Sequence, residues 1–376
     1  MKIDEDLNAQ LLELVRSAIW DKMPAQEMFL SCDWLSLFRL AKVQTVAGLM
    51  ADAVSRLPSE CLPPKEVRMM LIGYMQQIQR MNEVHRKVIK KVYGLLKEDG
   101  TDAVFMKGLI VGTRYPNPML RQCGDIDFVV AKKDFEKTLK LLERIGTVDY
   151  ELIHEHHGMA FVDGVTLEPH YKVHNYQHPK NDKAMQGMFE EVFPTKLKCI
   201  DIDSEPIPVF PETFESVFLI SHMVNHVYEE GLGLRQVIDY AMFAHKACGK
   251  IDPKRHEDYL RRMHMERAHR VFVRICEKYL GLSPDIWSFQ YTDKEMAFAD
   301  LMMKDIMQVG NFGRGEYVFH RDGMWGDFQN YCWVIKRALQ LGYLCPTEAY
   351  MWPISKMGRY WEKKKHKSEN QHIKPQ

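Results

Sequence analysis

GDIDFVV, at residues 124–130, is the stretch of this sequence that decides the fold. Its apolar residues predict a buried strand, and that strand carries Asp125 and Asp127 two positions apart. Side chains alternate between the two faces of a strand, so both carboxylates project to the same side. Carboxylates held this close repel each other unless a cation lies between them. The stretch therefore predicts a site for a divalent cation that prefers oxygen ligands, Mg²⁺ or Mn²⁺.

The aspartate pair alone leaves a second interpretation open. The glycine and the first aspartate could form a turn before the strand, which would leave Asp127 as an exposed strand residue. The upstream sequence favours the metal site, because the apolar strand predicted at 103–106 ends at Lys107-Gly108. A glycine at that point lets backbone amides approach a phosphate, and the helix predicted to follow would present its N-terminus.

Two further segments bring side chains to the same place. Arg121, just upstream of the aspartate pair, can reach the same anion, bidentately where the geometry allows. Downstream, GVTLEPHY at 164–171 predicts a strand with Glu168 and His170 on one face, so Glu168 can serve as a third carboxylate. Pro169 cannot donate a hydrogen bond within a sheet, which predicts that this strand lies at an edge or is bulged there.

The rest of the chain predicts an α+β fold. Short strands, helices and two hairpins alternate through the centre, which predicts a compact unit with a small mixed sheet. The hairpins are predicted to turn at Asp163-Gly164 and near Ser204-Glu205. Apolar residues at three- and four-residue steps predict helices on both sides of this unit. The predicted parts are an N-terminal helical region at 1–100, the α/β core at 101–210, a C-terminal helical domain at 211–350 and a basic polar tail at 351–376.

Several helices can be placed by their periodicity. A long amphipathic helix is predicted from about 65 to 98, with Gly100 as part of its stop signal. Further along, two helices are predicted to carry HMVNH at 222–226 and LRQVID at 234–239. A single helix is predicted to follow them, from about 254 to 280.

Two constellations in the helical half leave alternatives open. HMVNH places two histidines at i and i+4, which is metalloprotease spacing, but Met223 stands where the essential glutamate would be. Together with the histidines between 154 and 178, this pair permits a weaker interpretation as a zinc hydrolase. Arg235 and Asp239 are also at i and i+4; they either pair with each other or line the substrate cleft, where His170 would also lie.

Composition restricts the partners. The 376 residues include 51 basic and 51 acidic side chains, so the net charge is zero and there is no strong nucleic-acid signal. The eight cysteines form no CxxC pair, which indicates reduced thiols in a reducing compartment. The N-terminal segment has acidic residues where a signal peptide would be basic, and no stretch has the ~20 apolar residues of a membrane helix. These features predict a cytoplasmic protein with no membrane partner.

The order of the motifs resembles a known family. The motifs are KG at 107–108, YPNP at 115–118, an arginine before GDIDFVV, and LEPHY at 167–171. Together they resemble the bacterial nucleotidyltransferase family often called uncharacterised nucleotidyltransferase family 5, of the DNA polymerase beta-like superfamily. The resemblance implies a polymerase-beta-like nucleotidyltransferase core, and it extends from about residue 100 into the helices after 211.

The resemblance also implies roles for the residues of these motifs. Metal binding and catalysis would belong to three carboxylates: Asp125, Asp127 and Glu168. The triphosphate of an NTP would be held by Lys107, Gly108 and Arg121. The reaction would move a nucleoside monophosphate to a hydroxyl acceptor, and zero net charge favours a small molecule or a protein over nucleic acid. The main alternative is a catalytically weak nucleotide-binding regulatory module on the same fold.

Overall fold

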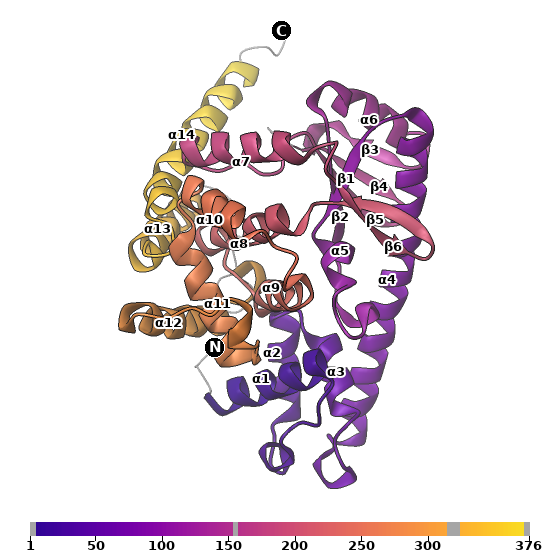
Figure 1. Ribbon diagram of the computed structural model, residues 1–376, viewed down its shortest axis with the longest axis vertical. Coiled ribbons are helices and arrows are strands. Elements are labelled where there is room, and N and C mark those ends of the chain that lie inside the picture. The colour runs from indigo at the N-terminus through magenta and orange to yellow at the C-terminus, as the bar shows by residue number, and fades with distance from the viewer. Residues whose placement is uncertain (1–4, 153–156, 314–323, 372–376) are drawn as a thin grey trace.

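The computed structural model describes residues 5–152, 157–313 and 324–371 (Figure 1). It confirms the α+β fold, because one mixed sheet has helical regions packed beside it. In the view of Figure 1 the sheet lies in the right half, the N-terminal helices lie below it, and the C-terminal helices fill the left half.

Seven strands form the sheet, in the order β3-β4-β5-β2-β1-β7-β6. The central strand β2 runs antiparallel to β1 and parallel to β5, and β1 runs parallel to β7. The remaining neighbours are antiparallel, so the sheet is mixed as predicted. The strand bounds are Ala103–Met106 for β1, Asp125–Val130 for β2, Thr147–Asp149 for β3, Met159–Val162 for β4, Val165–His170 for β5, Lys198–Ile202 for β6 and Glu205–Val209 for β7.

Both predicted hairpins are present. β4 and β5 turn at Asp163 and Gly164, whose φ angles of 50° and 80° are the left-handed values of a two-residue type I′ turn. The β6–β7 hairpin turns at Asp203 and Ser204, one residue earlier than predicted, with φ angles of 51° and 68°. Short polar side chains tolerate this conformation because they bond the local backbone, and here the Ser204 N–H donates to the Asp201 carboxylate at 3.1 Å.

The predicted edge position of β5 is wrong. This strand lies between β4 and β2, and Pro169 pairs with Phe128 of β2 in parallel register. The proline is tolerated because it stands beyond the residues of β4 that pair with β5. The N–H of Gly158 still donates to the Pro169 carbonyl at 2.9 Å, while a proline nitrogen can give no bond in return.

Helix α4 (Lys65–Asp99) has the length predicted for it and ends where Gly100 takes a left-handed φ of 76°. Its C-terminal half packs on one face of the sheet, where Val92 joins an apolar cluster with Phe128 of β2. Helix α6 (Phe135–Leu142) covers the same face through Leu139 and Leu142. Alternate side chains of β2 are buried in this cluster, so the intervening side chains look the other way.

The opposite face of the sheet looks toward the C-terminal helices (Figure 1). Where a single helix was predicted at 254–280 the structure has two, because His264, with a φ of 54°, interrupts the chain between α10 and α11. Helix α7 has no counterpart among the predicted helices. The remaining bounds are Gly108–Gly112 for α5, Pro179–Val192 for α7, Glu212–Glu229 for α8, Leu234–Ala247 for α9, Pro253–Arg262 for α10, Glu266–Leu280 for α11, Asp293–Val309 for α12, Met324–Leu341 for α13 and Pro346–Gln371 for α14.

The N-terminal helices pack with the C-terminal ones. One cluster of buried apolar residues includes side chains of both regions. Buried Gln44 joins them directly: it donates to the Ile306 carbonyl of α12 and accepts from the Leu234 N–H of α9, each at 2.8 Å. The three N-terminal helices are α1 (Glu5–Trp20), α2 (Trp34–Val43) and α3 (Ala47–Val54).

The last helix crosses the boundary predicted at 350. α14 continues to Gln371, and Trp352 within it is buried. The final residues of the predicted tail, 372–376, lie outside the described residues. None of the described helices has the combination of length and apolar character that a membrane span requires.

Candidate active site

Strands β2 and β5 place the acidic side chains. The two strands are parallel neighbours, with Asp125 opposite Thr166 and Asp127 opposite Glu168. Side chains at paired positions of adjacent strands lie on the same face, so Asp127 and Glu168 are side by side. Apolar Ile126 and Phe128 alternate with the aspartates and enter the cluster beneath α4 and α6. The predicted strand pattern therefore puts the carboxylates on the face that looks toward α8 and α9.

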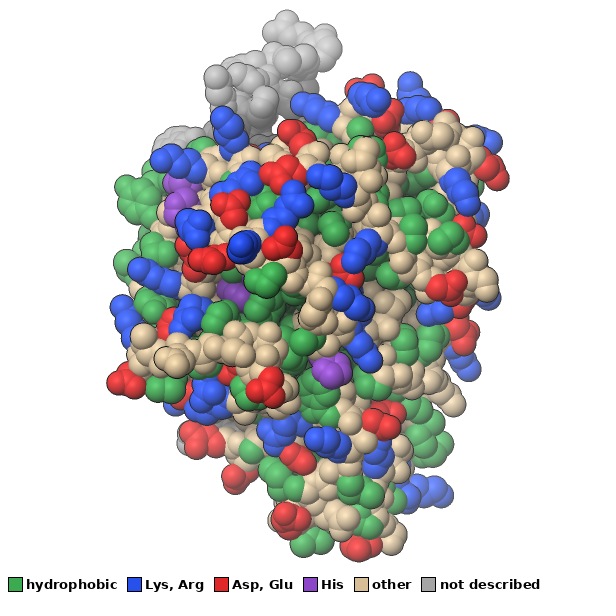
Figure 2. Space-filling view, in the orientation of Figure 1, with side chains coloured by type: hydrophobic (Ala, Val, Ile, Leu, Met, Phe, Trp, Pro, Cys, Tyr) green, Lys and Arg blue, Asp and Glu red, His purple; other side chains and the backbone are tan. Residues whose placement is uncertain are grey.

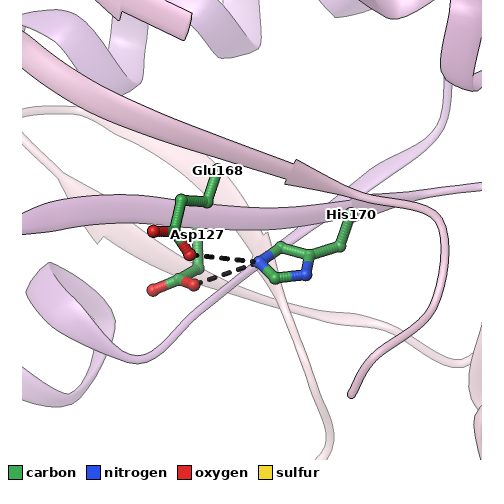
Figure 3. A group of neighbouring side chains, drawn as sticks. All are labelled: Asp127, Glu168 and His170. Atoms are coloured by element: carbon green, nitrogen blue, oxygen red, sulfur yellow. Dashed lines mark hydrogen bonds and ion pairs between the residues drawn. The ribbon is translucent and has the colours of Figure 1, made fainter. Parts of the chain in front are cut away.

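Asp127, Glu168 and His170 form a compact cluster (Figure 3). One ligand atom from each of the three lies within 4.8 Å of the others. The His170 Nε2 atom is 3.2 Å from Asp127 Oδ1 and 3.7 Å from Glu168 Oε2, so the ring is aimed between the two carboxylates. Asp127 and His170 are buried, whereas the Glu168 side chain is 24% exposed.

Asp125 stands at the rim of this cluster, half-buried at the start of β2. Burial raises the pKa of its carboxyl, and the negative charge of Asp127 raises it further. The pair on β2 therefore interacts electrostatically, as its spacing predicted. The close group of three, however, takes His170 as its third member rather than Asp125.

Lys107 enters the cluster from the end of β1. Its Nζ atom lies 2.9 Å from Asp127 Oδ1, in an ion pair whose side chains are 17% and 3% exposed. The residue caps α5 with φ of 54° and ψ of −146°, a conformation rare outside glycine. Gly108 follows with a φ of 34°, and a Cβ there would come within 3.1 Å of the Asp125 carbonyl oxygen. This close approach explains the glycine, but α5 has only five residues and offers little helix dipole.

The charges of the cluster shift one another's protonation. Burial opposes the ionised form of Asp127, yet the Lys107 charge and the His170 hydrogen bond together lower its pKa. Burial raises the pKa of Glu168 to about 8, and the nearby Asp127 charge adds to the rise. Burial lowers the pKa of His170, so the imidazole is neutral near pH 7. The pKa values of Asp127 and Glu168 are therefore shifted in opposite directions.

Arg121, for which anion binding was predicted, lies in a buried ion pair. Its guanidinium forms a bidentate pair with Asp239 of α9, with Nε–Oδ1 at 3.1 Å and Nη2–Oδ2 at 2.6 Å. The Tyr115 hydroxyl also donates to Asp239, at 2.6 Å. Both members of the pair are buried, so these contacts already use the charge of Arg121. The pair fastens the loop before β2 to α9.

Arg235 is less buried than Arg121. Asp239 bonds Arg121, so the predicted intrahelical pair between Arg235 and Asp239 is wrong. Arg235 is half-buried, its Nη1 donates to the Gln122 carbonyl at 2.9 Å, and its Nε has no hydrogen-bond partner. Its charge acts on Asp125, whose pKa it lowers against the larger effects of burial and of Asp127. The other alternative for Arg235, a place in the substrate cleft, stays a prediction.

Helix α8 brings His222 and His226 opposite the cluster. Their Nε2 atoms are 3.0 Å apart, and burial and the Lys107 charge lower the pKa of both rings, to about 3 for His226. Among the described residues, no group of three metal-binding side chains includes either ring. The zinc interpretation therefore has no support there. Two histidines on which it also drew, at 154 and 156, lie outside the described residues.

A family comparison identifies the chain. The model of the family described as uncharacterised nucleotidyltransferase matches residues 31–281, which is more than half of the sequence and includes every residue of the cluster. The chain belongs to this nucleotidyltransferase family. The resemblance carried by KG, YPNP, GDIDFVV and LEPHY is thereby confirmed. The protein is accordingly an enzyme of the nucleotidyl-transfer class.

Other comparisons add less. No curated protein matches the sequence. Among solved structures, the antibiotic-resistance factor ANT(2'')-Ia is 12% identical, with a TM-score of 0.34 over 47% of this chain and 89% of its own. An antigenic nucleotidyltransferase-like protein from Paracoccidioides brasiliensis is 14% identical, with a TM-score of 0.34 over 54% of this chain and 96% of its own. At these TM-scores neither likeness carries an argument about the site.

The donor set of the nucleotidyltransferase fits a divalent cation. Two carboxylates and one imidazole, with a further carboxylate at the rim, combine the oxygen and nitrogen ligands that such ions take in proteins. The i+2 spacing of His170 from Glu168 predicted the correct face of the strand for this ring. The sequence did not predict that the ring would reach Asp127. No sequence signal indicated that Lys107 would bond a carboxylate rather than face an anion.

Proposed function

We propose that this nucleotidyltransferase moves a nucleoside monophosphate from an NTP to a hydroxyl acceptor, with Mg²⁺ or Mn²⁺ as cofactor. The observation that carries the proposal is the placement of Asp125, Asp127 and Glu168 on one face of the sheet, across from basic Lys107 and Arg235. Phosphoryl chemistry of this kind depends on positioning and on charge stabilisation, which such an arrangement supplies.

Asp125, Asp127 and Glu168 would hold the metal, and His170 would fix the orientation of Asp127 through the 3.2 Å contact. A bound divalent ion supplies charge neutralisation of the phosphates and of the oxygens that attack and leave. The strand framework keeps these ligands in place, because the apolar side chains between them are locked under α4 and α6. The chain itself therefore contributes a preorganised, partly buried set of oxygen donors.

Glu168 would help to activate the acceptor hydroxyl through the metal ion that it helps to hold, because a divalent ion lowers the pKa of an oxygen bound to it. The Glu168 side chain is also the most exposed of the three clustered residues, so an acceptor can approach it. Asp127, with a lowered pKa, remains an ionised ligand throughout.

Lys107 and Arg235 would hold the triphosphate. Arg235 replaces Arg121 in this role, because Arg121 is bound on both sides of its guanidinium fork by Asp239. The Arg235 side chain projects from α9 beside Asp125, and its half-buried guanidinium would donate to a phosphate oxygen. Gly108 lets the backbone after β1 lie close to β2, because a Cβ there would come within 3.1 Å of the Asp125 carbonyl oxygen.

A small molecule or a protein hydroxyl is the favoured acceptor. The net charge of the chain is zero, and basic and acidic side chains alternate over the face seen in Figure 2. Nucleic-acid-binding proteins carry a basic stripe for the phosphate backbone, and that face carries none. That face therefore offers no basic track for a nucleic-acid acceptor.

The test is release of pyrophosphate. The purified protein is incubated with each of the four ribonucleoside triphosphates and with Mg²⁺ or Mn²⁺, in the presence of candidate hydroxyl acceptors, and pyrophosphate is measured. We expect metal-dependent release that chelation abolishes. Binding of Mg²⁺-NTP without any pyrophosphate across the acceptor panel would favour the alternative, a nucleotide-binding regulatory module. Stoichiometric, tightly bound zinc would favour the hydrolase interpretation.

A further inference from the structure

Lys107 is placed inside the carboxylate cluster rather than beside it. Its ammonium contacts the same oxygen, Asp127 Oδ1, that accepts the hydrogen bond from His170. Glu168 pairs with Asp127 across the two strands, so a second carboxylate lies beside this ion pair. This one cation offsets a group of carboxylates that would otherwise repel each other in a partly buried site.

The surrounding structure directs Lys107 to this position. The backbone values of 54° for φ and −146° for ψ belong to a region that side-chain-bearing residues rarely adopt, so the fold imposes them. The ring of Phe218 from α8 lies 6.0 Å from the ammonium and closes the other side. A lysine that merely faced a phosphate would need neither the unusual backbone nor the carboxylate contact.

The contact is in conflict with a bound metal. A divalent ion coordinated by Asp127 would lie within a few ångströms of the Lys107 ammonium, where like charges repel strongly in a partly buried site. Asp127 Oδ1 also has limited room, because it already receives Nζ at 2.9 Å and His170 Nε2 at 3.2 Å. Lys107 and an ion coordinated through Oδ1 would therefore compete for Asp127, and the lysine would have to move for the ion to bind there.

We infer that Lys107 is a tethered counter-ion that occupies the position a metal ion would take beside Asp127. It leaves this position when a nucleoside triphosphate binds and its phosphates pair with the ammonium. The inference rests on the proposed function, since it assigns the order of binding at the same site. It makes metal binding and nucleotide binding interdependent: the bare ion binds weakly, and the triphosphate strengthens its binding by drawing Lys107 away. Such coupling is reciprocal, so the ion strengthens nucleotide binding equally.

The test measures Mn²⁺ and nucleotide affinity separately. Mn²⁺ affinity of the nucleotide-free protein is measured by electron paramagnetic resonance, and affinity for non-hydrolysable analogues of all four ribonucleoside triphosphates by calorimetry at saturating Mn²⁺. In Lys107→Met, bare Mn²⁺ should bind about tenfold more tightly than in the wild type, because the competing charge is gone. The nucleotide analogue that the wild type prefers should bind about tenfold more weakly, because its phosphate loses a partner.

Lys172→Met is the matched control. It breaks the ion pair of Lys172 with Asp182, which has a 2.7 Å contact and side chains that are each 25% exposed, and which lies outside the carboxylate cluster. Both affinities should stay at wild-type values. Lys107→Arg, which keeps the charge, should leave Mn²⁺ binding weak. An equal or weaker Mn²⁺ affinity in Lys107→Met would overturn the inference, because a purely structural lysine would loosen the site for both ligands.

Two results separate this inference from the proposed function. If the wild type binds no nucleotide analogue with Mn²⁺, the proposed function fails. If it binds the analogue but Lys107→Met shows no opposite change in the two affinities, only the counter-ion role fails. Should Lys107→Met not fold, the wild type decides alone: Mn²⁺ that binds equally well with and without the analogue contradicts the coupling, and Mn²⁺ that binds about tenfold more tightly with it supports the coupling.

Discussion

The side chains on the two faces of strand β2 are buried to nearly the same extent, but one face is apolar and the other is charged. Phe128 is 0% exposed on the face beneath α4 and α6, and Asp127 is 3% exposed on the face that looks toward α8 and α9. Phe128 is enclosed by apolar side chains, including Val92 and Phe105. Asp127 is instead surrounded by the Lys107 ammonium, the His170 ring and the Glu168 carboxylate. Exposure alone therefore does not distinguish a core residue from a site residue.

The difference lies in what the burial achieves. An apolar side chain gains stability from loss of water, whereas a carboxylate needs compensating charge to remain buried. The apolar face thus fixes the position of β2, and the polar face uses that fixed position to hold charges close together. Two ion pairs on the polar side differ in how many contacts hold them. Arg121–Asp239 is closed by two hydrogen bonds and fastens α9, while Lys107–Asp127 rests on a single contact.

The largest effect is expected when the polar face loses its central charge. Asp127→Asn should lower the rate of pyrophosphate release by at least ~10³-fold, because the metal loses an ionised ligand while the strand stays in place. Exposed Asp102, just before β1, offers a control, and Asp102→Asn should leave the rate unchanged. Steady-state rates with circular dichroism of both variants provide the measurement. Full activity in Asp127→Asn would remove Asp127 from the site.

The apolar face is tested by making a cavity in it. Phe128→Ala should lower the free energy of unfolding by about 3–5 kcal/mol, since it deletes a fully buried ring. Phe161→Ala, on strand β4 of the same sheet, removes a ring that is 40% exposed and should lower it by less than about 1 kcal/mol. Urea titration measures both. Equal losses in the two variants would mean that the face beneath α4 does not hold β2 as described.

Arg121 and Arg235 are expected to differ in whether their loss affects stability or nucleotide binding. Arg121→Met should destabilise the fold by about 3 kcal/mol, because it leaves the buried Asp239 carboxylate without its ionic partner. Arg235→Met should hardly change the free energy of unfolding but should weaken nucleotide binding about tenfold. Urea titration and calorimetry with a nucleotide analogue give the two values. A stable Arg121→Met protein with weak nucleotide binding would restore the anion-binding role to Arg121.

The smallest effect concerns pH. Folding raises the pKa of Glu168 from 4.5 to about 8, chiefly through burial, so between these values the folded state holds a proton that the unfolded chain releases. The free energy of unfolding of the metal-free protein should therefore fall as pH rises from about 5 to 8. Glu168→Gln should remove this part of the slope, about 1 kcal/mol per pH unit or less, because the side chain is partly solvated. Urea midpoints across this pH range check it, and an unchanged slope in Glu168→Gln would contradict it.

Much of the core was predictable because its signals are local. Alternation in IDFVV placed β2, the apolar run before Lys107 placed β1, and both hairpins follow from turn residues that tolerate positive φ. The long helix α4 follows from its periodicity and from Gly100. The family match then confirmed the class of enzyme that these motifs predicted. Local periodicity and turn chemistry depend on residues that are close together in the chain, so they can be predicted from the sequence.

The pairing of side chains across the fold was not available in the same way. Arg121 and Asp239 are 118 positions apart, and the sequence predicted a different partner for each. The strand order around Pro169 and the break at His264 also depend on which elements pack together.

By itself the sequence determined the aspartate-bearing strand, its flanking helices and the family to which they belong, because spacing along a strand or helix dictates which side chains share a face. Only the tertiary structure decided which charges meet. It joined Lys107 to Asp127, brought His170 between two carboxylates, and paired Asp239 with Arg121 rather than with Arg235. The physical reason is that an ion pair is chosen by distance and by desolvation, and both are settled only when distant segments pack.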